Sequence, residues 1–221
     1  RDLARLLFGL AQAGQATRRE VLGVLAAQYA ELEVTDLHSD IDVAWALCAL
    51  EMDGKYGAVL DTILHRCGDV SPPQSRIALI KLHDVLAVVG SDVAGGRLRA
   101  AASHAASAEA ERVAGSQFYG QVARAWRGLR DLEFPQQQAA VGPFIVDFFQ
   151  EKSALVLDLD LVSWPMTRRL RHRLLEDLGY RTVLLSPWDL RSIRSEEELR
   201  GFLGDQVSRA LGKVLGQKGR G

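Results

Sequence analysis

Three aspartates near the end of the chain have the residue type and spacing of a metal site. Asp158 and Asp160 alternate with leucines in an apolar stretch, residues 154–160, so a strand here would carry both carboxylates on one face. Asp147 lies in another apolar stretch, residues 144–149, which is expected to form the neighbouring strand. If the three carboxylates converge, they can bind a divalent cation, as in metal-dependent nucleases. The alternative is that they lie in solvent at a strand end or accept hydrogen bonds from nearby arginines.

A basic helix is expected directly after the second strand, over about residues 166–178. Its expected inward face consists of Leu170, Leu174 and Leu178. The basic side chains around that face are Arg168, Arg169, Arg171, His172 and Arg173. Because a planar guanidinium group donates bidentately to phosphate, this patch is the best candidate for contact with nucleic acid. The alternative is a solvated helix face paired with Glu176 and Asp177.

The neighbouring elements complete a small α/β module over residues 116–221. A helix is expected from about residue 118 to residue 132, and residues 182–185 form an apolar strand suited to the middle of a sheet. Gly179 fits the end of the basic helix. Ser195 and Glu198 have the serine-x-x-glutamate spacing that caps the start of a last helix.

The first 115 residues have the pattern of repeated helical hairpins. Apolar stripes at helical spacing alternate with breaks at Gly14 and Gly54. The pattern recurs at a period of about 38 to 40 residues, and a third unit is expected to start with Ser71 as N-cap and two prolines in the first turn. Since one hairpin cannot cover its own apolar face, the pattern predicts a short α-solenoid; a plain helical bundle is the alternative.

Composition and charge restrict the classes of partner. The chain has 221 residues, of which 48% are hydrophobic and 25% charged, which is enough for one or two domains with real cores. Residues 1–115 carry 11 basic and 15 acidic side chains, whereas residues 116–221 carry 16 and 13. Duplex-DNA binders usually have a stronger basic excess. Any contact with nucleic acid is therefore expected to be local and to lie in the second part.

The two cysteines give no sign of a metal site. Cys48 and Cys67 fall on different expected helices and lack metal-ligand spacing, so both are expected to be small buried hydrophobes. No run of about 18 apolar residues occurs, so no transmembrane helix is expected. The chain opens at Arg1, which suggests a processed or partial chain. We expect no cofactor and no bound metal.

The order of these features resembles the RAP domain of organellar RNA-binding proteins. RAP domains look like a reduced restriction-endonuclease fold, with an acidic residue in two successive strands, a basic helix ending in glycine and an aromatic residue, an apolar strand and a turn with tryptophan. The matching residues are Val146-Asp147, Asp158-Leu159-Asp160, Arg171 with Leu174, Gly179-Tyr180 and Trp188. The upstream hairpins are similar to the repeats of about 37 residues that precede RAP domains. The resemblance implies an α-helical repeat array, residues 1–115, followed by an α/β RAP domain, residues 116–221.

The chain departs from the RAP pattern at positions that matter for catalysis. Asp158 stands where the family has glutamate, Leu161 where it has glycine, and Trp164 where it has histidine. No lysine lies beside the acidic pair, where a restriction-type nuclease uses one to stabilise the attacking water or the scissile phosphate. We therefore expect that the protein is not an enzyme.

The function implied by the resemblance is RNA binding in mitochondria. RNA would be held by the basic helix, and by Trp188 in the following turn. The acidic first part favours contact with protein, so we expect a component of a large ribonucleoprotein such as the mitochondrial ribosome, with ribosomal RNA and ribosomal proteins as partners and no membrane. The alternatives are a free regulator of mitochondrial RNA processing or stability, and a metal-dependent endoribonuclease.

Overall fold

The computed structural model describes residues 2–12, 19–33, 35–68, 71–90, 95–129, 132–161 and 167–217 of the 221-residue chain. The chain divides into two compact units, Arg1–Ala106 and Ser107–Gly221. Their boundary falls inside helix α6 (Gly96–Ala114), whereas the predicted domain limit after residue 115 lies just beyond this helix. Within the described residues, none of the helices combines the length and the apolar character that crossing a lipid bilayer requires.

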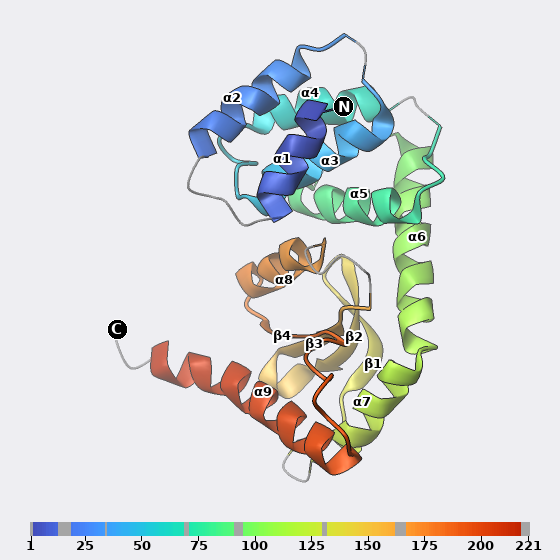
Figure 1. Cartoon of the computed structure of the whole chain (residues 1–221), viewed down its shortest axis with the longest axis vertical. Coiled ribbons are helices and arrows are strands. Elements are labelled where there is room, and N and C mark those ends of the chain that lie inside the picture. The colour runs from blue at the N-terminus through green and yellow to red at the C-terminus, as the bar shows by residue number, and fades with distance from the viewer. Residues whose placement is uncertain are drawn as a thin grey trace. The chain divides into compact units, whose positions relative to one another are not determined.

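The helices of the first unit pack in an alternating order (Figure 1). They are α1 (Asp2–Gln12), α2 (Arg19–Ala30), α3 (Leu37–Ala49), α4 (Gly57–Cys67) and α5 (Arg76–Val89), followed by the start of α6. Helix α3 packs against both α1 and α5, and α2 packs against α4. Contact between every second helix is the arrangement that stacked hairpins require, because each hairpin buries its apolar face on the next.

Helix α5 begins later than the sequence pattern predicts for the start of the third unit. Helix α5 starts at Arg76, and its N-cap is Ser75, whose Oγ accepts a hydrogen bond from the Ala78 amide at 3.3 Å. The predicted cap at Ser71 is therefore wrong. The physical reason is that a proline disfavours the helical conformation in the residue before it, so the proline pair at 72–73 delays the first turn.

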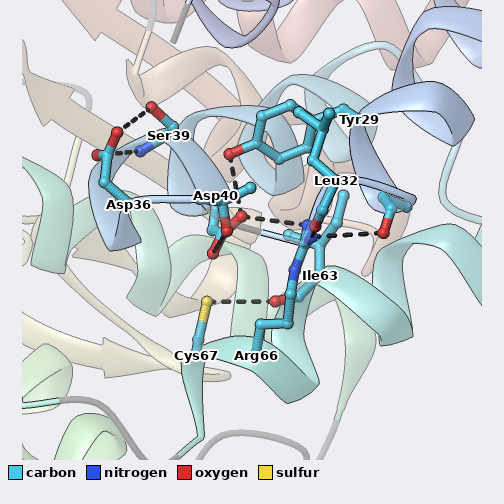
Figure 2. Close-up of polar contacts among 10 residues, drawn as sticks. Tyr29, Leu32, Asp36, Ser39, Asp40, Ile63, Arg66 and Cys67 are labelled. Carbon is cyan, nitrogen blue, oxygen red and sulfur yellow. Dashed lines mark hydrogen bonds and ion pairs between the residues drawn. The ribbon is translucent and has the colours of Figure 1, made fainter.

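A buried polar network joins three helices of this unit, as Figure 2 shows. Asp40 of α3 accepts hydrogen bonds from the Tyr29 hydroxyl at 3.0 Å, from the Thr35 hydroxyl at 3.0 Å and from Arg66 Nη2 at 3.2 Å. Arg66 also donates to the main-chain oxygen of Leu32 at 2.8 Å. Burial raises the pKa of Asp40, and the bond from Tyr29 and the charge of Arg66 oppose that rise. The network therefore fixes α2, α3 and α4 to one another.

The second unit makes the chain a mixed α/β protein. Its elements are α7 (Gln117–Arg127), β1 (Gln136–Val141), β2 (Phe144–Gln150), β3 (Leu155–Leu159), α8 (Thr167–Asp177), β4 (Arg181–Leu185) and α9 (Glu196–Gln217). The four strands lie in the order β1-β2-β3-β4. The first two pairings are antiparallel and the third is parallel, so α8 is the crossover between β3 and β4.

Different helices cover the two faces of this sheet (Figure 1). Leu155, Leu157 and Leu159 of β3 lie in a core with α7 and α9, where the ring of Tyr119 stacks on that of Phe148 at 4.5 Å between centroids. Helix α8 lies over the other face, to which β3 presents Asp158. The alternation predicted for residues 154–160 is therefore confirmed at its leucines and at Asp158.

Strand β1 is the element that the sequence pattern does not predict. Its first residues are three glutamines followed by two alanines, all of which lack the β-branched and aromatic character of typical strands. It pairs with β2 from Gln136, opposite Phe149, to Val141, opposite Phe144. Pairing with an aromatic neighbouring strand thus stabilises a segment whose own propensity is low.

The inward face of α8 also differs from the prediction. Leu170 and Leu175 are buried, whereas Leu178 is 58% exposed. The predicted stripe through Leu178 is therefore wrong. The reason is that α8 ends at Asp177, so Leu178 lies in the turn beyond the helix. Arg171 and His172 face Asp158 on the sheet.

The thiol of Cys67 gives a test of the first unit. Burial raises its pKa to about 12, and the side chain is fully buried. Because this folded-state pKa lies above the ordinary value of 9.0, folding keeps the thiol protonated, and the stability that this adds is lost as the pH rises from 9.0 to about 12. We expect the Cys48→Ala protein at about pH 9 to react with Ellman's reagent only after denaturation. Labelling of the native protein as fast as the denatured chain would contradict this.

Candidate nucleic-acid interface

Two of the three aspartates meet across neighbouring strands, and the carboxylate of each accepts a main-chain amide of the other strand. The amide of Asp147 in β2 donates to Asp158 Oδ1 at 3.0 Å, and the amide of Leu159 in β3 donates to Asp147 Oδ2 at 2.7 Å. The two aspartates are 2% and 0% exposed. Each carboxylate therefore satisfies an amide that would otherwise be buried without an acceptor.

This exchange lies where the two strands stop pairing. The register of β2 and β3 runs from Gln150, opposite Leu155, to Phe148, opposite Leu157. Beyond that point the main chains are joined by the two carboxylates rather than by a continued ladder. The acidic pair that resembles a metal site thus closes the fork between two diverging strands.

Asp158 is also the anchor of α8. Arg171 Nε lies 3.1 Å from Asp158 Oδ2, and His172 Nε2 lies 3.4 Å from the same oxygen. Arg171 further donates through Nη2 to the main-chain oxygen of Ile145, and its guanidinium carbon lies 5.2 Å from the centroid of the Phe144 ring. Two side chains of the predicted basic patch are consequently turned towards the sheet, where the Arg171 guanidinium neutralises the buried Asp158 carboxylate and His172 lies beside it.

Gln138 and Tyr119 support Asp147 from the side of β1 and α7. Gln138 Nε2 donates to Asp147 Oδ1 at 3.1 Å, and the Tyr119 hydroxyl donates to the main-chain oxygen of Asp147 at 3.1 Å. Burial raises the pKa of Tyr119 to about 12, so its hydroxyl remains a donor at neutral pH. Gln138 has a φ of 50°, a conformation that costs a residue other than glycine about 1–3 kcal/mol. The sequence gives no signal for either role.

The third aspartate does not complete a metal site with the other two. The Asp160 amide donates to the main-chain oxygen of Leu185 at 2.8 Å, which continues the pairing of β3 and β4. Asp160 is 3% exposed. Among the described residues, no group of three or more histidine, cysteine, aspartate or glutamate side chains is arranged to hold a metal ion.

The exposed side chains that could bind a ligand lie near the carboxyl ends of the parallel strands β3 and β4, a place that is called the carboxyl edge below. Because β3 and β4 are parallel, with Leu159 opposite Leu185, the main chain leaves the sheet at the same edge after each of the two strands. Helix α8 begins near this edge at Thr167 and runs back along the sheet. Ligands of open α/β sheets commonly bind outside such carboxyl ends.

The remaining arginines of the basic patch belong to α8. Arg168 and Arg169 lie in its first turn, next to the carboxyl edge, and their side chains fall outside the described part of the chain. Arg173 lies further along the helix, and its Nε is 3.9 Å from Asp177 Oδ2. The helix therefore has two arginines at its start and one partly paired arginine in its middle.

An aromatic side chain is exposed in the turn after β4. Trp188 is 61% exposed, and the guanidinium carbon of Arg191 lies 3.1 Å from the centroid of its ring. The turn is held by Asp189, whose Oδ2 accepts hydrogen bonds from the amide and the hydroxyl of Ser186, both at 2.7 Å. Sequence reasoning identified Trp188 and missed Arg191, although its position three residues later in a tight turn could have indicated the pairing.

A small cavity lies beside this turn, on the side of α7 and α9. Its volume is about 230 Å³, and its lining includes Gln121, Arg124, Ile193, Arg194 and Glu196. Arg124 Nε lies 4.0 Å from a carboxylate oxygen of Glu196, and Arg194 adds a second positive charge to the lining.

Replacing Asp158 tests whether the carboxylate cluster is structural. Asp158→Asn keeps the shape but removes the charge that Arg171 and His172 face, so we expect the free energy of unfolding to fall by about 3–5 kcal/mol. Adding Arg171→Met removes the stranded cation, and we expect most of the loss to be recovered. Urea denaturation followed by tryptophan fluorescence measures both effects.

The control for this experiment is Asp205→Asn, because Asp205 is exposed on α9. Its replacement is expected to change the free energy of unfolding by less than about 0.5 kcal/mol. Equal stability of the Asp158 and Asp205 variants would contradict a structural role for Asp158.

Comparison with known proteins adds no assignment. No protein-family model matches the chain, and no curated protein matches it at a significant level of sequence similarity. The function of the site therefore has to follow from the chemistry of its own residues.

Proposed function

We propose that the second unit binds single-stranded RNA at the carboxyl edge of β3 and β4, as a non-catalytic component of a mitochondrial ribonucleoprotein. The observation that carries this proposal is the exposed ring of Trp188 beneath the guanidinium group of Arg191. Unpaired RNA bases stack on aromatic rings and on arginine planes, and such stacking tolerates many sequences. An exposed tryptophan held in this way has no evident role in stabilising the fold.

The start of α8 supplies the electrostatic part of the proposed interface. Arg168 and Arg169 lie in its first turn, close to the edge from which the Trp188 turn leaves the sheet. Phosphate contacts by arginine supply affinity that does not depend on sequence, while stacking orders the bases. In this proposal Arg171 and His172 act indirectly, because their bonds to Asp158 hold α8 on the sheet.

The order of elements supports the resemblance to RAP domains. Helix α7, the antiparallel strands β2 and β3, the crossover helix α8 and the parallel strand β4 follow one another in the order of the RAP pattern. Strand β1 is an addition to that pattern. The alternating helical packing upstream of it supports a short repeat array of the kind that precedes RAP domains. A mitochondrial location and a place in the mitochondrial ribosome follow from this resemblance.

The hydrogen bonds of Asp147 and Asp158 favour RNA binding over RNA cleavage as the function. A metal-dependent nuclease needs carboxylate oxygens that can ligate a cation and position a water. Asp147 and Asp158 instead direct oxygens at main-chain amides, and Asp158 also faces two basic side chains. Metal binding here would compete with bonds that hold β2 and β3 together, which is why the endoribonuclease is not the function proposed.

RNA binding can be tested by fluorescence anisotropy with a labelled single-stranded RNA of mixed sequence. We expect Trp188→Ala and Arg191→Ala each to weaken binding about tenfold, because stacking on an aromatic side chain contributes about 1–3 kcal/mol per base. Joint replacement of Arg168 and Arg169 by alanine should lower the slope of log affinity against log salt by about two.

The matched control is Lys152→Ala. Lys152 lies in the connection between β2 and β3, at the opposite edge of the sheet, and forms an ion pair with Glu133. Its replacement also removes one positive charge but should leave the affinity within about twofold of the original protein. An equal loss per positive charge from Lys152→Ala and from the arginine replacements, with none from Trp188→Ala, would show diffuse charge attraction and would contradict a defined site.

The place of the protein in the cell is tested by gradient sedimentation of a mitochondrial lysate, with and without ribonuclease. A ribosomal component should migrate with ribosomal particles, and ribonuclease should release it. Migration in light fractions together with messenger or precursor RNA would instead establish a free regulator.

A further inference from the structure

Strand β4 is an edge of the sheet with main-chain groups turned outward. The Arg181 amide donates to the main-chain oxygen of Ala154, and the main-chain oxygen of Leu185 accepts from Asp160, both at 2.8 Å. These groups point towards β3. Since main-chain direction alternates along a strand, the amides and carbonyls of Thr182 and Leu184 point to the opposite, outer edge. No strand among the described residues pairs with that edge.

A groove runs along this outer edge. Its volume is about 670 Å³, and the lining includes consecutive residues of β4 from Arg181 to Leu184. Gln206 and Arg209 of α9 line it on one side, and Glu176 at the end of α8 lines it on the other. An open strand edge between two helical walls is a template for one more extended strand.

The two sides of the groove differ in chemistry. Val183 and Leu185 lie in the core with α9, so Arg181, which shares their side of the strand, lies on the α9 side with Arg209. Thr182 lies on the α8 side, where its hydroxyl donates to Glu176 at 2.7 Å. Within the part of the chain that the structure describes, neither Arg181 nor Arg209 forms an ion pair. The α9 side of the groove is therefore cationic, whereas the α8 side combines the apolar side chain of Leu184 with Thr182 and the carboxylate of Glu176.

We propose that β4 binds an extended segment of a partner protein in which acidic and apolar side chains alternate. The segment adds a fifth strand through hydrogen bonds to Thr182 and Leu184. Its acidic side chains face Arg181 and Arg209, and its apolar side chains face Leu184. Pairing through the main chain supplies the affinity, and the alternation supplies the specificity. This surface lies apart from the turn of Trp188, so it gives the second unit a protein contact in addition to the proposed RNA contact.

The test uses a fluorescein-labelled peptide of seven residues in which valine and glutamate alternate, and the same peptide with lysine in place of glutamate. We expect the full chain to bind the glutamate peptide more tightly, and Arg209→Glu to reverse that preference. Hydrogen exchange should show the amides of Thr182 and Leu184 exchanging faster than those of Val183 and Leu185 in the unbound protein, and becoming protected by the glutamate peptide.

Thr182→Pro is the decisive variant, with Thr182→Val as its matched control. Proline removes the outward amide that the peptide needs while leaving the bonds to β3, whereas valine keeps the amide and removes only the hydroxyl. We expect Thr182→Pro to weaken peptide binding about tenfold or more relative to Thr182→Val, with circular dichroism showing both variants folded. Equal binding by these variants, or no binding of the glutamate peptide to the original protein, overturns the proposal.

Two other occupants of the groove would give distinct results in these experiments, and either result would overturn the proposal. If single-stranded RNA displaces the peptide, and RNA binding falls in Arg209→Glu but not in Thr182→Pro, the groove is a phosphate site. If sedimentation velocity shows a dimer that Thr182→Pro dissociates, the edge is occupied by a second copy of the chain.

Discussion

The exchange of carboxylate–amide hydrogen bonds between Asp147 and the Asp158-Leu159 segment is the constraint on which the second unit depends. Two strands that diverge leave main-chain amides without partners, and a buried amide without an acceptor is costly. Here each aspartate accepts the amide at or next to the other, so both amides at the fork have an acceptor. The same carboxylate of Asp158 then draws Arg171 to the sheet and sets how α8 packs. Sheet and crossover helix are thus joined by one small polar cluster.

These hydrogen bonds also limit where a ligand can bind. Carboxylates that already hold the main chain are poorly placed to ligate a cation without loosening the fold. The exposed features lie elsewhere on the same unit, at the Trp188 turn and along the outer edge of β4. A small α/β unit can in this way keep its acidic residues for stability and use its periphery for recognition. The first unit has its own polar cluster around Asp40, which joins α2, α3 and α4 (Figure 2).

The sequence predicts the parts of this structure that depend on local periodicity. The leucines of β3 alternate as expected, and the Ser195 hydroxyl accepts the Glu198 amide at 3.1 Å as the capping pattern implies. The pattern fails where long-range contacts decide. Strand β1 forms because β2 pairs with it, and Arg171 and His172 turn inward because Asp158 lies on the sheet beneath α8. Sequence patterns identified the aspartates and the basic helix. The hydrogen bonds between the two aspartate segments depend on how β2 and β3 are aligned, and the sequence of a single strand does not show that alignment.

The central claim is that RNA lies at the carboxyl edge of β3 and β4. The measurement that tests it most directly is ultraviolet crosslinking of the chain to single-stranded RNA, with the crosslinked peptides identified by mass spectrometry. The account predicts that the crosslinks fall in residues 167–177 and 186–194, with Trp188 and Arg191 among them. Crosslinks confined to the first unit, or to the connection between β2 and β3, would contradict it.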